Sequence, residues 1–277
     1  MDRLALAALR ASGLLVAAGL LFLLGQVLIR GLPAIDRDFL LTGPRAMGRA
    51  GGVLPSLVGT AAVGGVALVL AVPVGVGTAI YLAEYAREGP AAAAIRLAAE
   101  ALAGVPSVVF GLFGFSLFVI RLGLGWSILS GGLTLALMIL PTIIRTAEES
   151  IRAVPQIHRE LSSALGATGW QTVTRVVLPG AWPGILSGMA LALGRSAGET
   201  AAVMFTAGTS LRPPRSLLDP ARTLSVHFYL LAREGHALDR AYGVAALLVL
   251  SVLAVSGAAR LLPRLAAGHR AVAKRDQ

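Results

Sequence analysis

The sequence predicts an all-α integral membrane protein with six transmembrane helices. Of its 277 residues, 56% are hydrophobic and 14% are charged, and the charged residues leave six uncharged runs of at least 19 residues. Soluble chains carry about 25% charged residues. Because roughly 20 apolar residues of helix cross a hydrocarbon core about 30 Å thick, each run is long enough to span a membrane. The runs cover residues 11–29, 50–83, 101–120, 122–144, 176–194 and 241–259.

The charged residues also divide the chain into segments. Residues 1–31 form the predicted N-terminal transmembrane helix, whose 19 uncharged residues exceed the ~7 to 15 of a cleaved signal segment. Residues 32–54 are polar with several Gly, Pro and Arg, which predicts an extracytoplasmic loop. Residues 55–262 hold the other five runs and form the predicted core, and residues 263–277 form a cytoplasmic tail. A small excess of basic residues on that side predicts that both termini are cytoplasmic.

The later spans differ in regularity. Pro73, Pro106 and Pro141 lie inside the second, third and fourth spans, where a missing N–H and a ring clash bend or interrupt a helix. The fifth predicted span runs from about Gly180 to Gly208. Residues 146–179, which precede this span, are polar and helix-compatible, and they predict an ordered cytoplasmic segment.

This cytoplasmic segment contains a recognisable motif. Residues 155–179 read PQIHRELSSALGATGWQTVTRVVLP. They resemble the docking motif of ABC importer permeases, which is Glu-Ala-Ala, three residues, Gly, nine residues, Ile, one residue and Leu-Pro. Leu161 and Ser162 replace the two alanines and Val176 replaces the isoleucine, while the spacing is complete.

The local chemistry suits a compact helix-turn-helix. Pro155 can begin a helix, and Gly166 allows a turn at positive φ before a second helix. In the importer family this segment docks into the ATPase subunit, which implies the same role here for Glu160, Leu161, Gly166, Leu178 and Pro179. An interfacial amphipathic connection between two spans is the alternative.

The chain has no nucleotide-binding motif of its own. Lys274 is its only lysine, and no Gly-x-x-x-x-Gly-Lys-Ser/Thr sequence is present. We therefore expect a transporter subunit rather than an enzyme, with ATP hydrolysis supplied by a partner.

Two ionisable residues lie inside the fifth predicted span. Arg195 and Glu199 are four residues apart, which places them on one face of a continuous helix. A charged group at membrane depth costs at least ~2.5 to 3.5 kcal/mol, so it is expected to be paired or to face a wet path. Guanidinium also binds phosphate in a bidentate manner. Spacing alone is equally compatible with a structural ion pair.

Residues 193–200, LGRSAGET, are similar to the corresponding span of the phosphate (Pst) importer permeases, the PstA type most closely. Stretches at 51–60, 79–85, 103–111 and 224–229 agree, so the resemblance covers most of residues 51–262. It implies a type I ABC importer permease core, MetI-like, preceded by an N-terminal helix. It also implies that Arg195, Glu199 and Thr200 line a path for inorganic phosphate across the inner membrane.

The same resemblance implies a set of partners. They are a sister permease (PstC-like), a dimer of ATP-binding subunits (PstB-like) and an extracytoplasmic phosphate-binding protein (PstS-like). In a soluble protein the net charge of +10 would suggest nucleic acid. Here the cations flank membrane spans and suit lipid headgroups, so we expect membrane lipid and no nucleic acid. With no Cys and no metal-ligand spacing, we expect neither a metal nor a cofactor.

Three other functions fit part of the sequence. Gly194-Arg-Ser-Ala-Gly198 matches Gly-x-Ser-x-Gly, which would make Ser196 the nucleophile of an intramembrane protease. That site needs a histidine at the same depth, and all four histidines lie in predicted loops. A secondary transporter driven by an ion gradient would not require the docking segment. Molybdate and sulfate are alternative substrates within the importer class.

Small residues recur at every fourth position of the fifth span. They are Gly180, Gly184, Gly188, Ala192, Ser196 and Thr200. Such a stripe permits close helix approach. Its spacing does not distinguish packing within the chain from contact with a sister permease.

Overall fold

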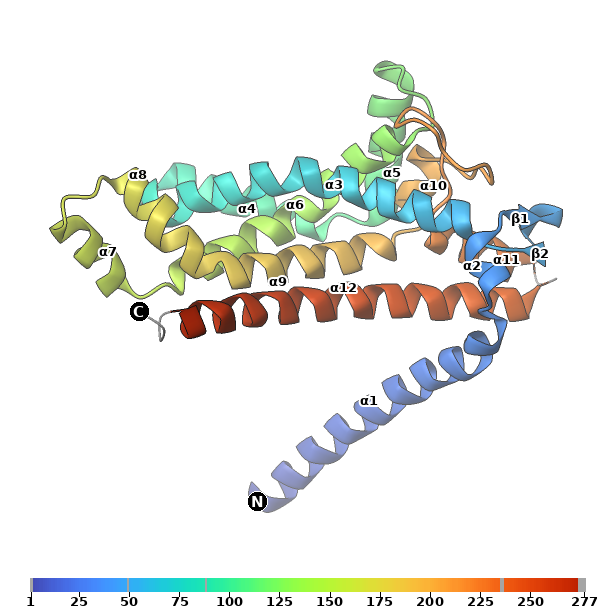
Figure 1. Ribbon diagram of the computed structural model, residues 1–277, viewed down its shortest axis with the longest axis horizontal. Coiled ribbons are helices and arrows are strands. Elements are labelled where there is room, and N and C mark those ends of the chain that lie inside the picture. Colours follow the sequence, from blue (N-terminus) through green and yellow to red (C-terminus); the bar gives the residue numbers. More distant parts are fainter. Residues whose placement is uncertain (1, 49, 88, 235–236, 274–277) are drawn as a thin grey trace.

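The computed structural model describes residues 2–48, 50–87, 89–234 and 237–273, and these are mostly helical (Figure 1). The N-terminal part contains α1 (Asp2–Gly31), η1 (Leu32–Ala34), α2 (Arg37–Leu41), β1 (Pro44–Arg45), η2 (Ala46–Gly48) and β2 (Ala50–Gly51). The core contains α3 (Leu54–Ile80), η3 (Tyr81–Tyr85), α4 (Pro90–Gly104), α5 (Ser107–Gly114), η4 (Phe115–Arg121) and α6 (Ile128–Arg152). It continues with α7 (Gln156–Ala164), α8 (Gly169–Thr172), η5 (Val173–Val177), α9 (Leu178–Ala197), α10 (Ala201–Thr206), α11 (Leu224–Glu234) and α12 (Leu238–Ala273).

Among the described residues, five helices are long and apolar enough to cross a membrane, or six spans are present if one bent pair of helices counts as a span. The five are Ala5–Ala34, Leu54–Tyr85, Ile128–Arg152, Gly169–Ala197 and Leu238–Ala258. The predicted third span is this bent pair, Pro90–Gly104 and Ser107–Arg121, which meet at 99°. Pro106 explains the break, because proline lacks an N–H and disfavours helical geometry in the residue before it. The preceding Val105 is accordingly extended, with φ −71° and ψ 131°.

The fifth span is also interrupted, whereas the second and fourth are not. Helix α9 ends at Ala197 and α10 begins at Ala201, so the expectation of one helix from Gly180 to Gly208 is wrong. Gly198 favours an ending because glycine is a poor helix former. Helices α3 and α6 continue through Pro73 and Pro141.

The segment between the first two spans is ordered and packs on the end of the bundle. Strands β1 and β2 pair antiparallel, with Pro44 opposite Gly51. Asp36 caps α2, because its carboxylate accepts a hydrogen bond of 2.6 Å from the Phe39 backbone N–H. Phe39 is 1% exposed and belongs to a cluster with Leu224 of α11 and Val244 of α12. The loop therefore packs against the beginnings of α11 and α12.

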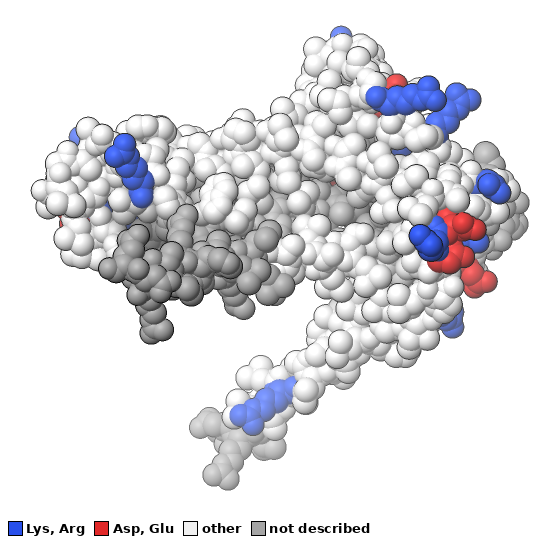
Figure 2. Space-filling model, viewed as in Figure 1, with Lys and Arg blue, Asp and Glu red and all other residues white. Residues whose placement is uncertain are grey.

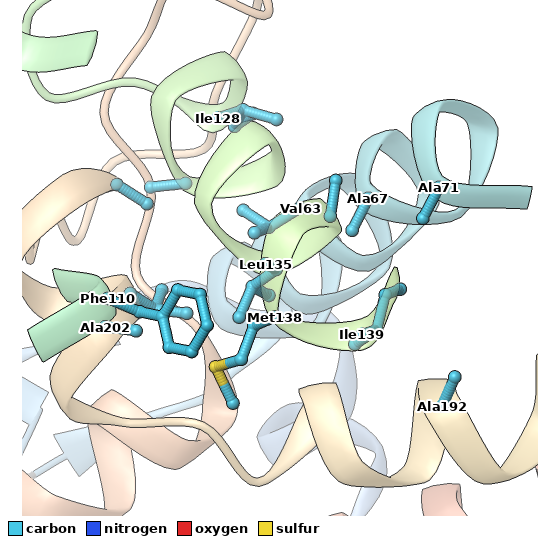
Figure 3. Packing of buried hydrophobic residues seen from close by; sticks show 14 of the residues in the cluster. Val63, Ala67, Ala71, Phe110, Ile128, Leu135, Met138, Ile139, Ala192 and Ala202 are labelled. Carbon is cyan, nitrogen blue, oxygen red and sulfur yellow. The ribbon is translucent and has the colours of Figure 1, made fainter. Parts of the chain in front are cut away.

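The central core lies between α3 and α6, with α5, α9 and α10 around it. Figure 3 shows Val63 and Ala67 of α3 near Leu135 and Ile139 of α6, with Phe110 of α5 nearby. Ala67 and Ile139 are fully buried. Small side chains on α3 allow the two helices to approach closely, which increases van der Waals contact where lipid provides no hydrophobic driving force.

The small-residue stripe of α9 packs within the chain. Gly180 faces Val154, and a Cβ added at Gly184 would lie 2.8 Å from Ser150 Cβ. A Cβ at Gly188 would lie 2.6 Å from Thr146 Cβ. The structure thus assigns these glycines to contact with α6 and its C-terminal end.

Helix α1 stands apart from the bundle and contacts it through its last turn (Figure 1). Arg30 donates a hydrogen bond of 3.3 Å to the Tyr242 hydroxyl on α12, and its guanidinium lies 5.3 Å from the centre of that ring. Gly31 lies against the Tyr242 backbone. The most apolar part of α1 buries none of its surface inside the chain.

Charged residues gather towards the ends of the molecule. In the view of Figure 2 the middle of the bundle is uncharged, while basic and acidic side chains lie over its two ends. We call the end that holds α2, the β1–β2 hairpin, α11 and the 207–223 loop the outer end, and the opposite end, which holds α7 and α8, the inner end (Figure 1). Helix α12 ends on the α7 side at Ala273, and residues 274–277 of the predicted tail lie outside the described residues.

At the outer end, α11 buries a histidine next to an arginine. His227 is 1% exposed, and its Nδ1 lies 3.3 Å from Nη1 of Arg222. Arg222 also donates hydrogen bonds of 2.9 and 2.7 Å to the Thr209 carbonyl. Burial, and then the nearby guanidinium, lower the pKa of His227 to about 4.

Replacing Gly188 with valine tests the α6–α9 contact. The added side chain would collide with Thr146, and overpacking of this kind costs about 1–3 kcal/mol. We expect a lower thermal unfolding midpoint for the detergent-solubilised protein. Gly77→Val is the matched control, because a Cβ at Gly77 has nothing within 4 Å. Equal midpoints for the two variants would contradict the assigned contact.

The buried histidine predicts a loss of stability in acid. Above pH ~6.5 His227 is neutral in both the folded and the unfolded chain. Between about pH 6.5 and pH 4 the imidazole is protonated in the unfolded chain but stays neutral in the folded chain. Stability therefore falls as the pH decreases through this window, by about 3 kcal/mol in total. The unfolding midpoint should drop more between pH 7.5 and pH 5 in the parent than in His227→Gln. The same drop in both would count against a neutral His227.

Candidate functional site

The docking motif folds as two short helices joined by a tight turn. Glu160 and Leu161 lie on α7, and Gly166 has φ +80° in the turn, as its position in the motif predicts. Thr168 then begins α8 with a capping box: its hydroxyl accepts from the Gln171 N–H at 3.3 Å, and the Gln171 side chain accepts from the Thr168 N–H at 2.9 Å. Two backbone N–H groups at the start of α8 are thus satisfied.

The last two motif residues lie at the start of the fifth span. Leu178 and Pro179 form the first turn of α9, where proline is tolerated because its missing N–H would be unpaired anyway. The π-helical segment η5 joins α8 to α9 without a loop. A continuous helical backbone therefore connects α8 to the fifth span.

One side of the α7–α8 unit is apolar and uncovered. Leu161 is 56% exposed, Leu165 is 88% exposed and Trp170 is 62% exposed. Ile157, one helical turn before Leu161, is also exposed. Clustered exposed apolar side chains of this kind mark a surface that contacts either another protein or the membrane interface.

The opposite side of α7 is held by an ion pair that sequence reasoning missed. Arg159 pairs with Glu84 of η3, with Nη2 2.7 Å from Oε1. The two residues are 75 positions apart in the sequence. A basic residue beside the motif glutamate and an acidic residue at the end of the second span were the available signals, but neither identifies the other as its partner.

The candidate pathway residues gather at the break in the fifth span. Arg195 lies exposed on the last turn of α9, Glu199 is half-buried in the break, and Thr200 precedes α10. The expectation that Arg195 and Glu199 share one face of a continuous helix is therefore wrong, because the helix ends between them at Ala197. Arg195 still acts electrostatically on the Glu199 carboxylate, and the Ser107 side chain at the start of α5 lies beside it.

Neighbouring segments satisfy the irregular backbone of the break. The Ser225 hydroxyl of α11 donates a hydrogen bond of 2.7 Å to the Glu199 carbonyl. The Gly198 and Glu199 N–H groups turn back to the carbonyls of Arg195 and Ser196, at 3.2 and 3.1 Å. Within a membrane, irregular backbone is tolerated where it is covered by protein or lines an aqueous cavity. The break therefore brings together polar backbone groups, the Arg195 guanidinium and the Glu199 carboxylate.

The protease alternative finds no support at Ser196. This serine is 4% exposed inside α9, and its hydroxyl donates a hydrogen bond of 2.9 Å to the Leu193 carbonyl. A nucleophile elbow needs a turn from strand to helix, whereas Ser196 lies within a helix. In the part of the chain that the structure describes, no group of three or more His, Asp or Glu could hold a metal ion.

A bundle of membrane helices with a docking segment between the fourth and fifth spans defines the permease class of ABC importers. The family described as binding-protein-dependent transport system inner membrane component matches residues 71–265, and the chain belongs to this family. The prediction of an importer-permease fold is confirmed.

Curated relatives cover nearly the whole chain. It is 35% identical to the "Probable ABC transporter permease protein YqgI" of Bacillus subtilis (strain 168), over 94% of each chain. It is 38% identical to the "Phosphate transport system permease protein PstA 1" of Mycobacterium tuberculosis (strain CDC 1551 / Oshkosh), over 91% of this chain and 84% of the relative. The PstA protein of Haemophilus influenzae is 32% identical, over 87% and 86%.

Solved structures share the fold at low identity. A chain of the MetNI methionine ABC transporter, in an inward-facing conformation, matches with a TM-score of 0.59 and 22% identity, over 77% of this chain and 94% of that one. A chain of a bacterial alginate ABC transporter matches with a TM-score of 0.68 and 16% identity, over 95% and 94%. These likenesses support the MetI-like arrangement of the core.

Proposed function

We propose that this chain is a permease subunit of an ATP-driven importer that moves inorganic phosphate across the bacterial cytoplasmic membrane. The observation that supports this proposal is the break at residues 198–200, which brings Glu199 near Arg195 at the end of α9. The relatives of the chain include phosphate permeases. An exposed guanidinium at this level suits a tetrahedral anion, which it contacts through two N–H groups.

The three pathway residues have distinct proposed roles. Arg195 provides a positive potential that draws phosphate from water. Glu199 orients the guanidinium and limits the depth of the anion well, because a transport site must release what it binds. The Thr200 hydroxyl offers a hydrogen bond to the passing anion. Molybdate and sulfate carry the same oxygen chemistry and are the competing substrates for this site.

The docking segment supports the energy source. We propose that Glu160, Leu161, Gly166, Leu178 and Pro179 couple the spans to a dimer of PstB-like ATP-binding subunits. The exposed Leu161 and Leu165 would be covered in the subunit cleft. ATP hydrolysis belongs to that partner, since the chain contains no P-loop sequence. An ion-coupled transporter would leave this apolar surface without a purpose.

The remaining assembly follows from the two ends of the bundle. We propose that the α7–α8 end and both termini are cytoplasmic, in accord with the end of α12 on the α7 side of the molecule (Figure 1). The opposite end would receive a PstS-like phosphate-binding protein. A PstC-like sister permease would complete the pathway opposite Arg195, because one bundle with an exposed arginine cannot enclose a path alone. Alternating access would follow from closure of the ATP-binding dimer.

Arg195→Gln tests the anion pathway. Removing one charge-assisted contact in a partly desolvated path should reduce phosphate uptake at least about tenfold, in line with 1.5–3 kcal/mol for hydrogen bonds to charged groups. Uptake of labelled phosphate by cells with verified assembly measures it. Glu199→Gln separates pairing from charge, and Arg121→Gln is an exposed-arginine control outside the site. Undiminished uptake in Arg195→Gln would exclude this role, and competition by molybdate or sulfate would identify a different substrate.

Gly166→Pro tests the coupling turn. Proline requires φ near −65° and cannot adopt the +80° of this turn, so α7 must move relative to α8. We expect reconstituted complexes to hydrolyse ATP while phosphate moved per ATP falls about tenfold, because a misplaced coupling element no longer transmits closure. Gly169→Pro is the matched control: it begins α8, and Thr168 before it has φ −70° and ψ 158°, which suit proline. Normal coupling in Gly166→Pro would contradict the proposal.

A further inference from the structure

We propose that Arg159 is a positioning residue that fixes the coupling helix α7 to the inner ends of α3 and α6, and that Glu84 is its essential partner. This inference rests on the proposed coupling role of α7 and extends it. It identifies the contact through which displacement of α7 reaches the second and fourth spans. Neither residue belongs to the docking motif.

The Arg159 guanidinium contacts three segments at once. Towards Glu84, Nε lies 3.1 Å from Oε1 and 3.3 Å from Oε2, and Nη2 lies 2.7 Å from Oε1. Its Nη1 donates a hydrogen bond of 2.6 Å to the Val154 carbonyl, and Nη2 donates one of 2.9 Å to the Ile151 carbonyl. Ile151 lies in the last turn of α6, and its carbonyl also accepts a hydrogen bond of 3.3 Å from the Val154 N–H. One side chain therefore joins α7, the end of α6 and η3.

Glu84 owes its position to the π-helical end of the second span. Segment η3 continues α3 with a wider turn, and the Ala86 N–H donates a hydrogen bond of 2.7 Å to the Tyr81 carbonyl five residues earlier. Such π turns often occur at functional sites. The side chains of Arg159 and Glu84 are only 16% and 12% exposed. A pair buried to this extent is weakly screened by salt, and removal of one partner leaves an uncompensated charge.

Helix α7 has little other attachment to the bundle. None of its nine side chains is buried, and Leu161 on its other side is exposed. The Ser162 hydroxyl lies 2.9 Å from that of Thr172, but this contact joins α7 to α8 within the docking unit. The other connections are the short chain links at 153–155 and 165–168 and the packing of α7 against η5. Arg159 is the side chain that ties α7 to η3 and to the end of α6, which are the ends of the second and fourth spans.

A second set of charges extends the connection. Glu148 on α6 pairs with Arg96 of α4 at 2.9 Å and with Arg152 at 3.1 Å. Arg152 also donates a hydrogen bond of 3.3 Å to the Leu82 carbonyl in η3. The end of α6, the middle of α4 and η3 are thereby tied together next to Arg159. Movement of α7 would be passed to these helices as a unit.

Transport coupling provides the first test. In proteoliposomes that contain the partner subunits, Arg159→Gln and Glu84→Gln should retain bound ATP-binding subunits and ATP hydrolysis. Phosphate moved per ATP should fall about tenfold in each, as for loss of one member of a buried pair. Arg159→Lys should recover part of the loss, and the double glutamine variant should be no worse than either single, because coupled residues are non-additive. Arg145→Gln is the control, since Arg145 pairs with Glu149 while 75% exposed.

Normal coupling in Arg159→Gln, or additive losses in the double variant, would overturn the inference. If Arg159→Gln does not assemble, recovery of assembly and coupling by Arg159→Lys or by the double variant supports it, and absence of recovery contradicts it.

A distance measurement tests the joint without reference to substrate. The chain has no native cysteine, so spin labels can be attached to Ser163→Cys on α7 and Tyr85→Cys on η3. The parent should give one narrow distance that is the same with and without ATP, and Arg159→Gln should give a broad distribution. An unchanged distribution in Arg159→Gln would overturn the proposal. If the parent complex fails to import phosphate, the substrate assignment is wrong, whereas this distance still decides the joint.

Discussion

The structure depends on the requirement that backbone hydrogen bonds be satisfied inside a medium without water. Helices meet this requirement alone, which is why apolar segments of this chain are helical. Each interruption needs outside help. At residues 198–200 that help comes from α11, whose Ser225 hydroxyl donates to the Glu199 carbonyl at 2.7 Å. The α11 N-terminus is tied down in turn, because the Leu224 N–H donates to Thr60 of α3 at 2.9 Å. The polar break is thus held by segments far away in the sequence.

The same constraint separates rigid from exposed parts. Small residues bring α3, α6 and α9 together, so the second, fourth and fifth spans form one packed unit. The docking unit α7–α8 connects to this unit through polar contacts and through the continuous η5–α9 junction. Apolar contacts are non-directional, whereas a bidentate arginine–carboxylate pair fixes both the distance and the relative orientation of the two side chains. A rigid unit with a directional joint is what transmission of movement from a partner requires.

Most of the fold could be predicted from hydropathy and from the positions of glycine, proline and charged residues. Each of the five long helices overlaps one of the uncharged runs, and Gly166 adopts the positive φ that its place in the motif indicates. A proline inside an apolar run is compatible with two outcomes: α6 continues through Pro141, whereas the third span is broken at Pro106. Packing against neighbours decides between these outcomes, and a local pattern contains no information about neighbours.

The sequence by itself determined the membrane class, the docking motif and the lack of a nucleotide site, because these depend on composition and on spacing within a few residues. The tertiary structure decided which helix the α9 glycines face, that Glu199 leaves the helix carrying Arg195, and that Arg159 finds Glu84 across 75 positions. Each of these outcomes requires two or more segments to meet in space. The physical reason is that side-chain pairing and helix interruption depend on packing between distant segments, and the local periodicity of a sequence contains no information about that packing.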